Sequence, residues 1–143
     1  MRATVIGCGR WGSFIAWYLN KIGHQVLLYG RESSARWQAF DKTRSNGLLT
    51  LEDSIILTSD LKEAVEYADL LFISIASQNL RSLFQQMSGF DLSCKTVVLC
   101  MKGIEVATGK RLTQVVRELA PETTRTAIWV GPGHVQDLSL IHI

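Results

Sequence analysis

The stretch VIGCGRWGSFIAWYLN, residues 5–20, places Gly7, Gly9 and Gly12 within six positions and then continues with apolar residues at helical spacing. Glycine loses more backbone freedom on folding than any other residue, so such a cluster indicates a sharp bend or a close approach to the main chain. The spacing is G-x-G-x-x-G, and it lies between a buried strand pattern and an amphipathic helix. This context predicts a dinucleotide-binding turn, with a purely structural glycine turn as the alternative.

Each glycine of this turn has its own expected role in cofactor binding. Gly7 permits the tight turn, Gly9 leaves space for a pyrophosphate against bare backbone, and Gly12 lets the helix pack closely on the strand. The N-terminus of the helix offers unpaired N–H groups and a partial positive charge to the phosphates. We therefore predict all three glycines as cofactor-binding residues.

Short apolar strands alternate with amphipathic helices along the rest of the chain, which is typical of a parallel sheet covered on both faces. We expect an α/β fold of the Rossmann type, a doubly wound, mostly parallel sheet with helices on both faces. The strands are expected at residues 3–6, 25–29, 55–58, 70–75, 96–100 and 126–130. The helices are expected at about 11–22, 34–41, 60–65, 78–87 and 108–119.

Composition narrows the classes of function. The 143 residues are 47% apolar and 20% charged, as in a single packed domain, and a net charge of +2 gives no reason to expect nucleic acid or a membrane as partner. The three cysteines include no CxxC pair, so we expect buried or free thiols in a reducing cytoplasm and no metal. We see no targeting segment and no apolar run near the roughly 20 residues that cross a bilayer.

The tip of the second predicted strand bears on the choice between NAD and NADP. An acidic residue there would accept hydrogen bonds from the adenosine ribose, whereas an arginine would pair with the 2′-phosphate of NADP. Gly30 stands where an acid often lies, and Arg31 follows it. We expect NADP to be favoured over NAD, while Glu32 leaves the use of both cofactors open.

Polar residues follow two later strands, at the edge of the sheet where open α/β folds bind ligands. Lys102 comes after the strand TVVLC, and a cation there can neutralise a substrate phosphate or polarise a carbonyl group. Ser77 and Gln78 follow the strand LLFISI, where they either lie near the nicotinamide or cap a helix. A solvated surface lysine is the alternative for Lys102.

Four blocks of sequence, in order, resemble bacterial NAD(P)-dependent sn-glycerol-3-phosphate dehydrogenases. The first, VIGCGRWGSFIAWYLNKIGHQVLLYGRE at 5–32, is similar to GxGxWGT followed by GHxVxLWxR. The second, TSDLKEAVEYADLLFISIASQNLRSL at 58–83, is similar to TxDLxxAxxxADxxxxxVPSQxxR. The third and fourth, CMKGIEVATGKRL at 100–112 and VGPGHVQD at 130–137, are similar to xTKGxExxTGxxL and SGPSFAxE.

The resemblance implies ligand contacts at matching positions. In this chain Gly133 replaces the family's Ser or Thr and His134 replaces its Phe, and the loss of a hydroxyl at 133 puts the substrate contact in doubt. The positions matched to cofactor contacts are Arg10, Trp11, Arg31, Lys102 and Val135. The positions matched to substrate contacts are Lys102, Gly131 and Gly133.

The resemblance also implies a reaction, namely hydride transfer between NAD(P)H and dihydroxyacetone phosphate or sn-glycerol 3-phosphate, which supplies phospholipid synthesis. In the family, a lysine from a C-terminal helical domain donates and accepts the proton, and no residue of this chain occupies that position. We therefore expect residues 1–137 to be an NAD(P)-binding domain that turns over little alone. The complete enzyme is expected in the cytoplasm, with a homodimer left open.

The last six residues, LSLIHI at 138–143, resemble the translated end of a transposon used in sequencing-library preparation. We expect them to be a non-native tail and the C-terminal domain to be missing from this chain. Two other functions stay open. One is a stand-alone dinucleotide-binding or sensing module, and the other is a related reductase such as a ketopantoate reductase, against which the KGxExxTG block argues.

Overall fold

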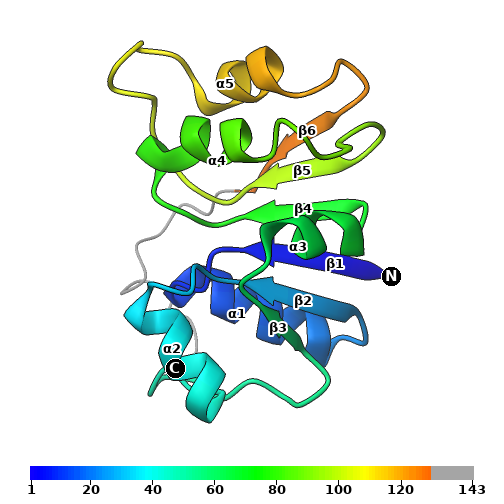
Figure 1. Ribbon diagram of the computed structural model, residues 1–143, viewed down its shortest axis with the longest axis vertical. Helices are drawn as coiled ribbons and strands as arrows, with labels where there is room; N and C mark the ends of the chain where they lie inside the picture. The colour runs from blue at the N-terminus through cyan, green and yellow to red at the C-terminus, as the bar shows by residue number, and fades with distance from the viewer. Residues whose placement is uncertain (130–143) are drawn as a thin grey trace.

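The computed structural model describes residues 1–129, which form a six-stranded sheet with helices on both faces (Figure 1). The strand order is β3-β2-β1-β4-β5-β6, and every neighbouring pair is parallel. This is the Rossmann order, so the predicted doubly wound sheet is confirmed. The strands are β1 (Arg2–Ile6), β2 (Gln25–Tyr29), β3 (Ile56–Thr58), β4 (Leu70–Ile73), β5 (Thr96–Leu99) and β6 (Arg125–Ile128).

The helices divide between the two faces because side chains alternate along each strand. Val5 and Leu28 face the layer that contains the first two helices, whereas Ile6 and Leu27 face the layer that contains the last three. The first layer holds α1 (Arg10–Lys21) and α2 (Ala35–Thr43). The second holds α3 (Leu61–Tyr67), α4 (Leu80–Gln86), which follows the short 3-10 turn η1 (Ser77–Asn79), and α5 (Leu112–Leu119).

The register brings the carboxyl ends of the central strands level with one another. Ile6, the last residue of β1, pairs with Tyr29 of β2 on one side and with Ile73 of β4 on the other. All strands point the same way, so the turns that follow β1, β2, β4 and β5 meet at a single edge of the sheet (Figure 1). Ligands bind at this edge in open α/β sheets.

The last helix begins later than the sequence predicts. It starts at Leu112 rather than near residue 108, because residues 101–111 form a loop that closes on itself. Ile104 bridges to Arg111, the Glu105 N–H donates to the Lys110 carbonyl over 2.9 Å, and Gly109 has φ +70°.

The other element ends lie within two residues of the predicted ones. The helix predicted to end near residue 41 continues to Thr43, where Arg44 stops it in the left-handed conformation at φ 55°. The strand predicted over 70–75 ends at Ile73, and η1 precedes α4. No helix among residues 1–129 is long and apolar enough to cross a membrane.

Candidate functional site

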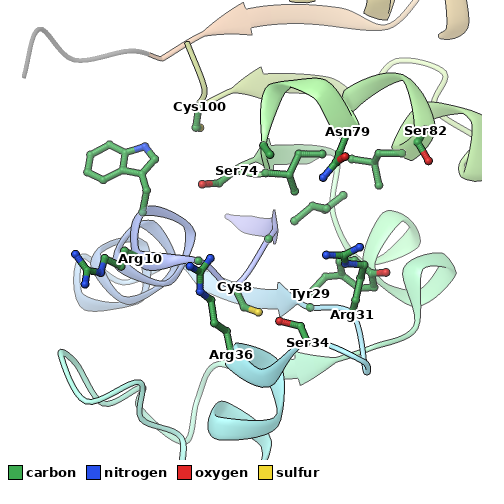
Figure 2. Close-up of a pocket in the computed structure, with 18 of the residues that line it drawn as sticks. Cys8, Arg10, Tyr29, Arg31, Ser34, Arg36, Ser74, Asn79, Ser82 and Cys100 are labelled. Carbon is green, nitrogen blue, oxygen red and sulfur yellow. The ribbon is translucent and has the colours of Figure 1, made fainter. Parts of the chain in front are cut away.

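A cavity of about 490 Å³ opens at the carboxyl edge of the sheet (Figure 2). Its walls come from the turn after β1, the turn after β2 with the start of α2, and the turn after β4 with part of η1 and α4. Cys100, just past β5, completes the lining. The three turns that meet here follow neighbouring strands, as the strand order requires.

Two of the three glycines are required by the protein's own packing. Gly7 has φ +114°, and a Cβ there would lie 2.1 Å from the Ser74 carbonyl oxygen. A Cβ on Gly12 would lie 1.9 Å from the Gly7 carbonyl oxygen. Both positions therefore exclude a side chain, which confirms the sharp turn and the close helix packing that the spacing predicts.

Gly9 differs, because the protein itself leaves room beside it. The nearest atom to a Cβ at Gly9 would be a terminal guanidinium nitrogen of Arg36, 3.7 Å away. The backbone at Gly9 is extended, with φ −70° and ψ −179°, a conformation that residues with side chains also adopt. Bare main chain therefore faces the cavity at Gly9 without a packing reason, which fits a ligand that comes very close.

The N-terminus of α1 points its free N–H groups at the same place. Gly9 is the N-cap, no side chain caps the helix, and the first turn contains no acidic residue. Such an end carries a partial positive charge and binds anions. The residues present therefore fit the diphosphate of a dinucleotide.

Three exposed arginines surround the cavity, and none forms an ion pair with another residue of the described part of the chain. Arg31 and Arg36 point towards the cavity from the turn after β2 and from α2, whereas Arg10 lies beside α1 (Figure 2). The sequence predicted Arg10 and Arg31 but missed Arg36. The one sequence signal for Arg36 beside the cavity is its position in the first turn of the helix that follows the β2 tip.

Packing explains why no acid stands at the β2 tip. A Cβ on Gly30 would lie 2.6 Å from the Trp37 ring and 2.7 Å from the Cys8 sulfur, so any side chain there would displace buried groups. The tip therefore offers no carboxylate at this position, and Arg31 is the first charged side chain after β2 that lines the cavity.

The cysteines are free, as expected, and two of them line the cavity. Burial raises the pKa of the Cys8 thiol, an effect that its hydrogen bond with Ser34 and the nearby Arg36 and Arg31 only partly oppose. Burial raises the pKa of Cys100 to about 12. Both are therefore neutral thiols at pH 7 rather than nucleophilic thiolates.

Ser77 and Lys102 lie beside this cavity rather than in its lining. Ser77 lies close to the backbone of Gly103, the residue after Lys102. A Cβ on Gly103 would lie 3.5 Å from the Ser77 hydroxyl oxygen. Neither Ser77 nor Gln78 caps a helix with its side chain. The amide of Gln78 instead binds the backbone of the loop that carries Lys102.

Three predicted residues, Gly131, Gly133 and Val135, lie outside the described residues, as do the proposed boundary at 137 and the tail at 138–143. They stay predictions. Within residues 1–129, no cluster of three or more His, Cys, Asp or Glu side chains is placed to hold a metal ion.

A family model and curated relatives relate this chain to the same kind of enzyme. The family described as "NAD-dependent glycerol-3-phosphate dehydrogenase N-terminus" matches residues 2–142. A glycerol-3-phosphate dehydrogenase (NAD(P)+) of a Thermoanaerobacter species is 30% identical over 141 residues, which are 96% of this chain and 42% of the relative. Its counterpart in Afipia carboxidovorans is 35% identical over 138 residues, 95% of this chain and 42% of that relative.

A solved structure shows the same fold. The crystal structure of glycerol-3-phosphate dehydrogenase from Coxiella burnetii superimposes with a TM-score of 0.83 at 19% identity, covering 97% of this chain and 43% of the other. The chain thus spans about two-fifths of the length of the proteins that it matches.

Proposed function

Since the chain belongs to the NAD-dependent glycerol-3-phosphate dehydrogenase N-terminus family, we propose that it is the NAD(P)-binding domain of an enzyme that interconverts dihydroxyacetone phosphate and sn-glycerol 3-phosphate. The observation that carries the cofactor part of this proposal is the open space over Gly9, in front of the uncapped N-terminus of α1. When bound, the nicotinamide cofactor supplies or accepts the hydride.

The residues divide between the two ends of the cofactor. Gly9 and the first N–H groups of α1 hold the diphosphate, and Arg36 adds a positive charge directly in front of Gly9. Arg31, beside the β2 tip, receives the adenosine end and pairs with the 2′-phosphate of NADP. NADP is therefore the favoured cofactor, with NAD as the weaker one.

Lys102 is proposed to act at the other end, past β5. Its ammonium group contacts the cofactor, and it neutralises the substrate phosphate or stabilises negative charge that develops on the carbonyl oxygen. Ser77 lies against Gly103, the residue after Lys102, which supports a position for both Ser77 and Lys102 at the nicotinamide end of the cofactor. Gly131 and Gly133 are proposed to face the substrate, and Val135 the cofactor.

The chain alone is proposed to bind cofactor but to turn over little, because the proton-transferring lysine of the complete enzyme lies outside it. The complete enzyme is proposed to be a cytoplasmic homodimer. A purified 143-residue chain with ordinary dehydrogenase turnover would contradict the first proposal. The boundary at Asp137 is tested by the gene, which should continue in frame into a C-terminal domain in place of LSLIHI.

Substitution of Arg31 tests cofactor binding and cofactor choice together. Arg31→Ala should raise the Kd for NADPH by about tenfold and that for NADH less than about twofold, because only NADPH carries the 2′-phosphate. Quenching of protein fluorescence or emission of the reduced nicotinamide gives both Kd values. Arg117→Ala, an exposed arginine of α5 outside the cavity, is the matched control. Equal losses for both cofactors would show that Arg31 does not read the 2′-phosphate.

A further inference from the structure

Beside the cavity, the loop of residues 101–111, called here the Lys102 loop, is tied to the segment that begins α4. Gln78 uses both ends of its side-chain amide for this. Its Nε2 donates to the Ile104 carbonyl over 2.8 Å, and its Oε1 accepts from the Val106 N–H over 2.9 Å. A second Nε2 contact reaches the Ser77 hydroxyl at 3.1 Å.

An ion pair fixes the same loop one turn further along α4. Arg81 donates from Nε to Glu105 Oε1 over 2.7 Å and from Nη2 to Oε2 over 2.9 Å. Such paired bonds fix orientation as well as distance. Glu105 is only 6% exposed and also accepts from the Thr108 hydroxyl. Arg81 extends the network to Glu118 of α5 over 3.0 Å.

These contacts hold the loop and leave the side chain of Lys102 available to contact a ligand. Gln78 and Arg81 grip positions 104 to 106, whereas Lys102 is exposed and forms no ion pair with the described residues. The loop's own backbone bonds, such as Glu105 N–H to Lys110 carbonyl, close it upon itself without attaching it to the sheet. Attachment to the η1–α4 segment therefore depends on the side chains of Gln78 and Arg81, while Lys110 pairs with Glu118 of α5 at the far end of the loop.

The gripping segment also touches the cavity. Residues 74–76 line it, and Gln78 and Arg81 follow within one and a half helical turns. Asn79 and Ser82, the neighbours of Gln78 and Arg81, also line the cavity, so one short stretch of chain both forms the cavity wall and holds the Lys102 loop. A ligand group held by both would meet Lys102 at a fixed distance without first ordering an eleven-residue loop.

We infer that Gln78 and the Arg81–Glu105 pair are positioning residues that hold Lys102 at the edge of the cavity. This rests on the proposed function, in which Lys102 contacts the cofactor. A loop fixed in advance costs little conformational entropy when the ligand binds, so loss of the clamp weakens binding although Gln78, Arg81 and Glu105 do not line the cavity. Ordering of the loop would otherwise oppose binding.

Amide exchange on the 143-residue chain tests the structural half of the inference. Gln78→Leu keeps the approximate size of the side chain but removes both of its hydrogen bonds to the Lys102 loop. Exchange of the Val106 N–H should accelerate by about tenfold, because one net hydrogen bond is lost. Gln85→Leu, on the exposed side of α4, is the matched control and should leave this amide unchanged. Unchanged protection of Val106 in Gln78→Leu would overturn the clamp, whether or not the chain binds dinucleotide.

A double-mutant cycle with NADPH tests whether the clamp works through Lys102. Gln78→Leu should raise the Kd by roughly threefold to tenfold in the native background and by less than about 1.5-fold in a Lys102→Ala background. A structural disturbance unrelated to Lys102 would raise the Kd equally in both. Equal effects in the two backgrounds, or no effect in either, would overturn the inference. Failure of the unaltered chain to bind NADPH or NADH would instead refute the proposed function.

Discussion

Gly7 and Gly9 are two positions apart in the chain, yet a side chain at each would have opposite consequences. At Gly7 the obstacle is the protein's own backbone, the Ser74 carbonyl oxygen, and φ is positive. At Gly9 the only neighbour within 4 Å is the flexible end of Arg36. Folding therefore depends on the first glycine and the proposed cofactor binding depends on the second.

We expect Gly9→Val to fold normally and to lose cofactor binding. The extended backbone suits a β-branched residue, but valine is a poorer N-cap than glycine, so the free energy of unfolding should fall by no more than about 1 kcal/mol. The Kd for NADPH should rise by more than about tenfold, because the side chain occupies the diphosphate position. Urea denaturation and fluorescence titration measure the two effects. Unchanged titration curves would refute the assignment of the diphosphate to this turn.

Gly7→Ala is the contrasting variant. Its Cβ would meet a backbone carbonyl at 2.1 Å in a left-handed conformation, and we expect a loss of at least about 2 kcal/mol in the free energy of unfolding. The midpoint of urea denaturation checks this. A stability equal to that of Gly9→Val would mean that the turn tolerates a shift that the geometry does not suggest.

At this scale the sequence predicted the packing roles of Gly7 and Gly12 and the place of Arg31 beside the cavity, whereas the cofactor contacts of these residues stay predictions. It did not predict Arg36, because the direction of a side chain in α2 depends on how that helix packs. It also gave no reason for Gly30, since the close approach of Trp37 and Cys8 joins residues from three segments.

Among the elements, the strands and helices follow the apolar pattern closely, whereas the Lys102 loop does not. Residues 108–111 continue a plausible helical pattern into α5, but Gly109 at φ +70° and the Ile104–Arg111 bridge keep them outside it. Hydrogen bonds within the loop decide this, and the apolar pattern does not contain them.

The buried Glu105, which joins the Lys102 loop to α4, should make the free energy of unfolding depend on pH. The hydrogen bonds from Arg81, above all, and from Thr108 lower the pKa of Glu105 to about 2 from an ordinary value of 4.5. Arg81, Thr108, Lys110 and Glu118 are the charged or polar groups around it. The stabilisation is therefore complete above about pH 4.5 and is lost as pH falls towards 2.

Glu105→Gln removes this dependence. We expect the variant to be less stable than the native chain at pH 6, and the difference to shrink steadily as pH falls from 4.5 to 2. Urea denaturation at several pH values measures it. Glu122→Gln, an exposed carboxylate without an ion pair in the described residues, is the control. A difference that does not vary with pH would refute the role of the Glu105 charge.

For the whole molecule, the cavity draws its walls from both halves of the sheet, β1 and β2 on one side and β4 and β5 on the other. Any ligand held there joins the two halves. The fold class and the edge of the sheet that binds ligands were predicted from alternating strands and helices. Its shape was not, because it depends on how three separate turns meet.

Cofactor should therefore stabilise the entire domain in a single transition. At a free concentration of 100 times its Kd, NADPH should raise the free energy of unfolding by about 2.7 kcal/mol, because it binds only the folded chain. Urea denaturation with and without NADPH measures the shift. Gly9→Val should show none, and an equal shift in that variant would point to binding elsewhere.

The contact of Gly7 with the Ser74 carbonyl group also has a consequence for folding during synthesis. The first β-α turn leaves the ribosome early, but the Ser74 carbonyl that it contacts follows β4 and is synthesised more than sixty residues later. A nascent chain that has not yet reached β4 has the glycine motif without the surface that shapes it. The pocket therefore cannot be completed before residue 74, just past β4, has emerged.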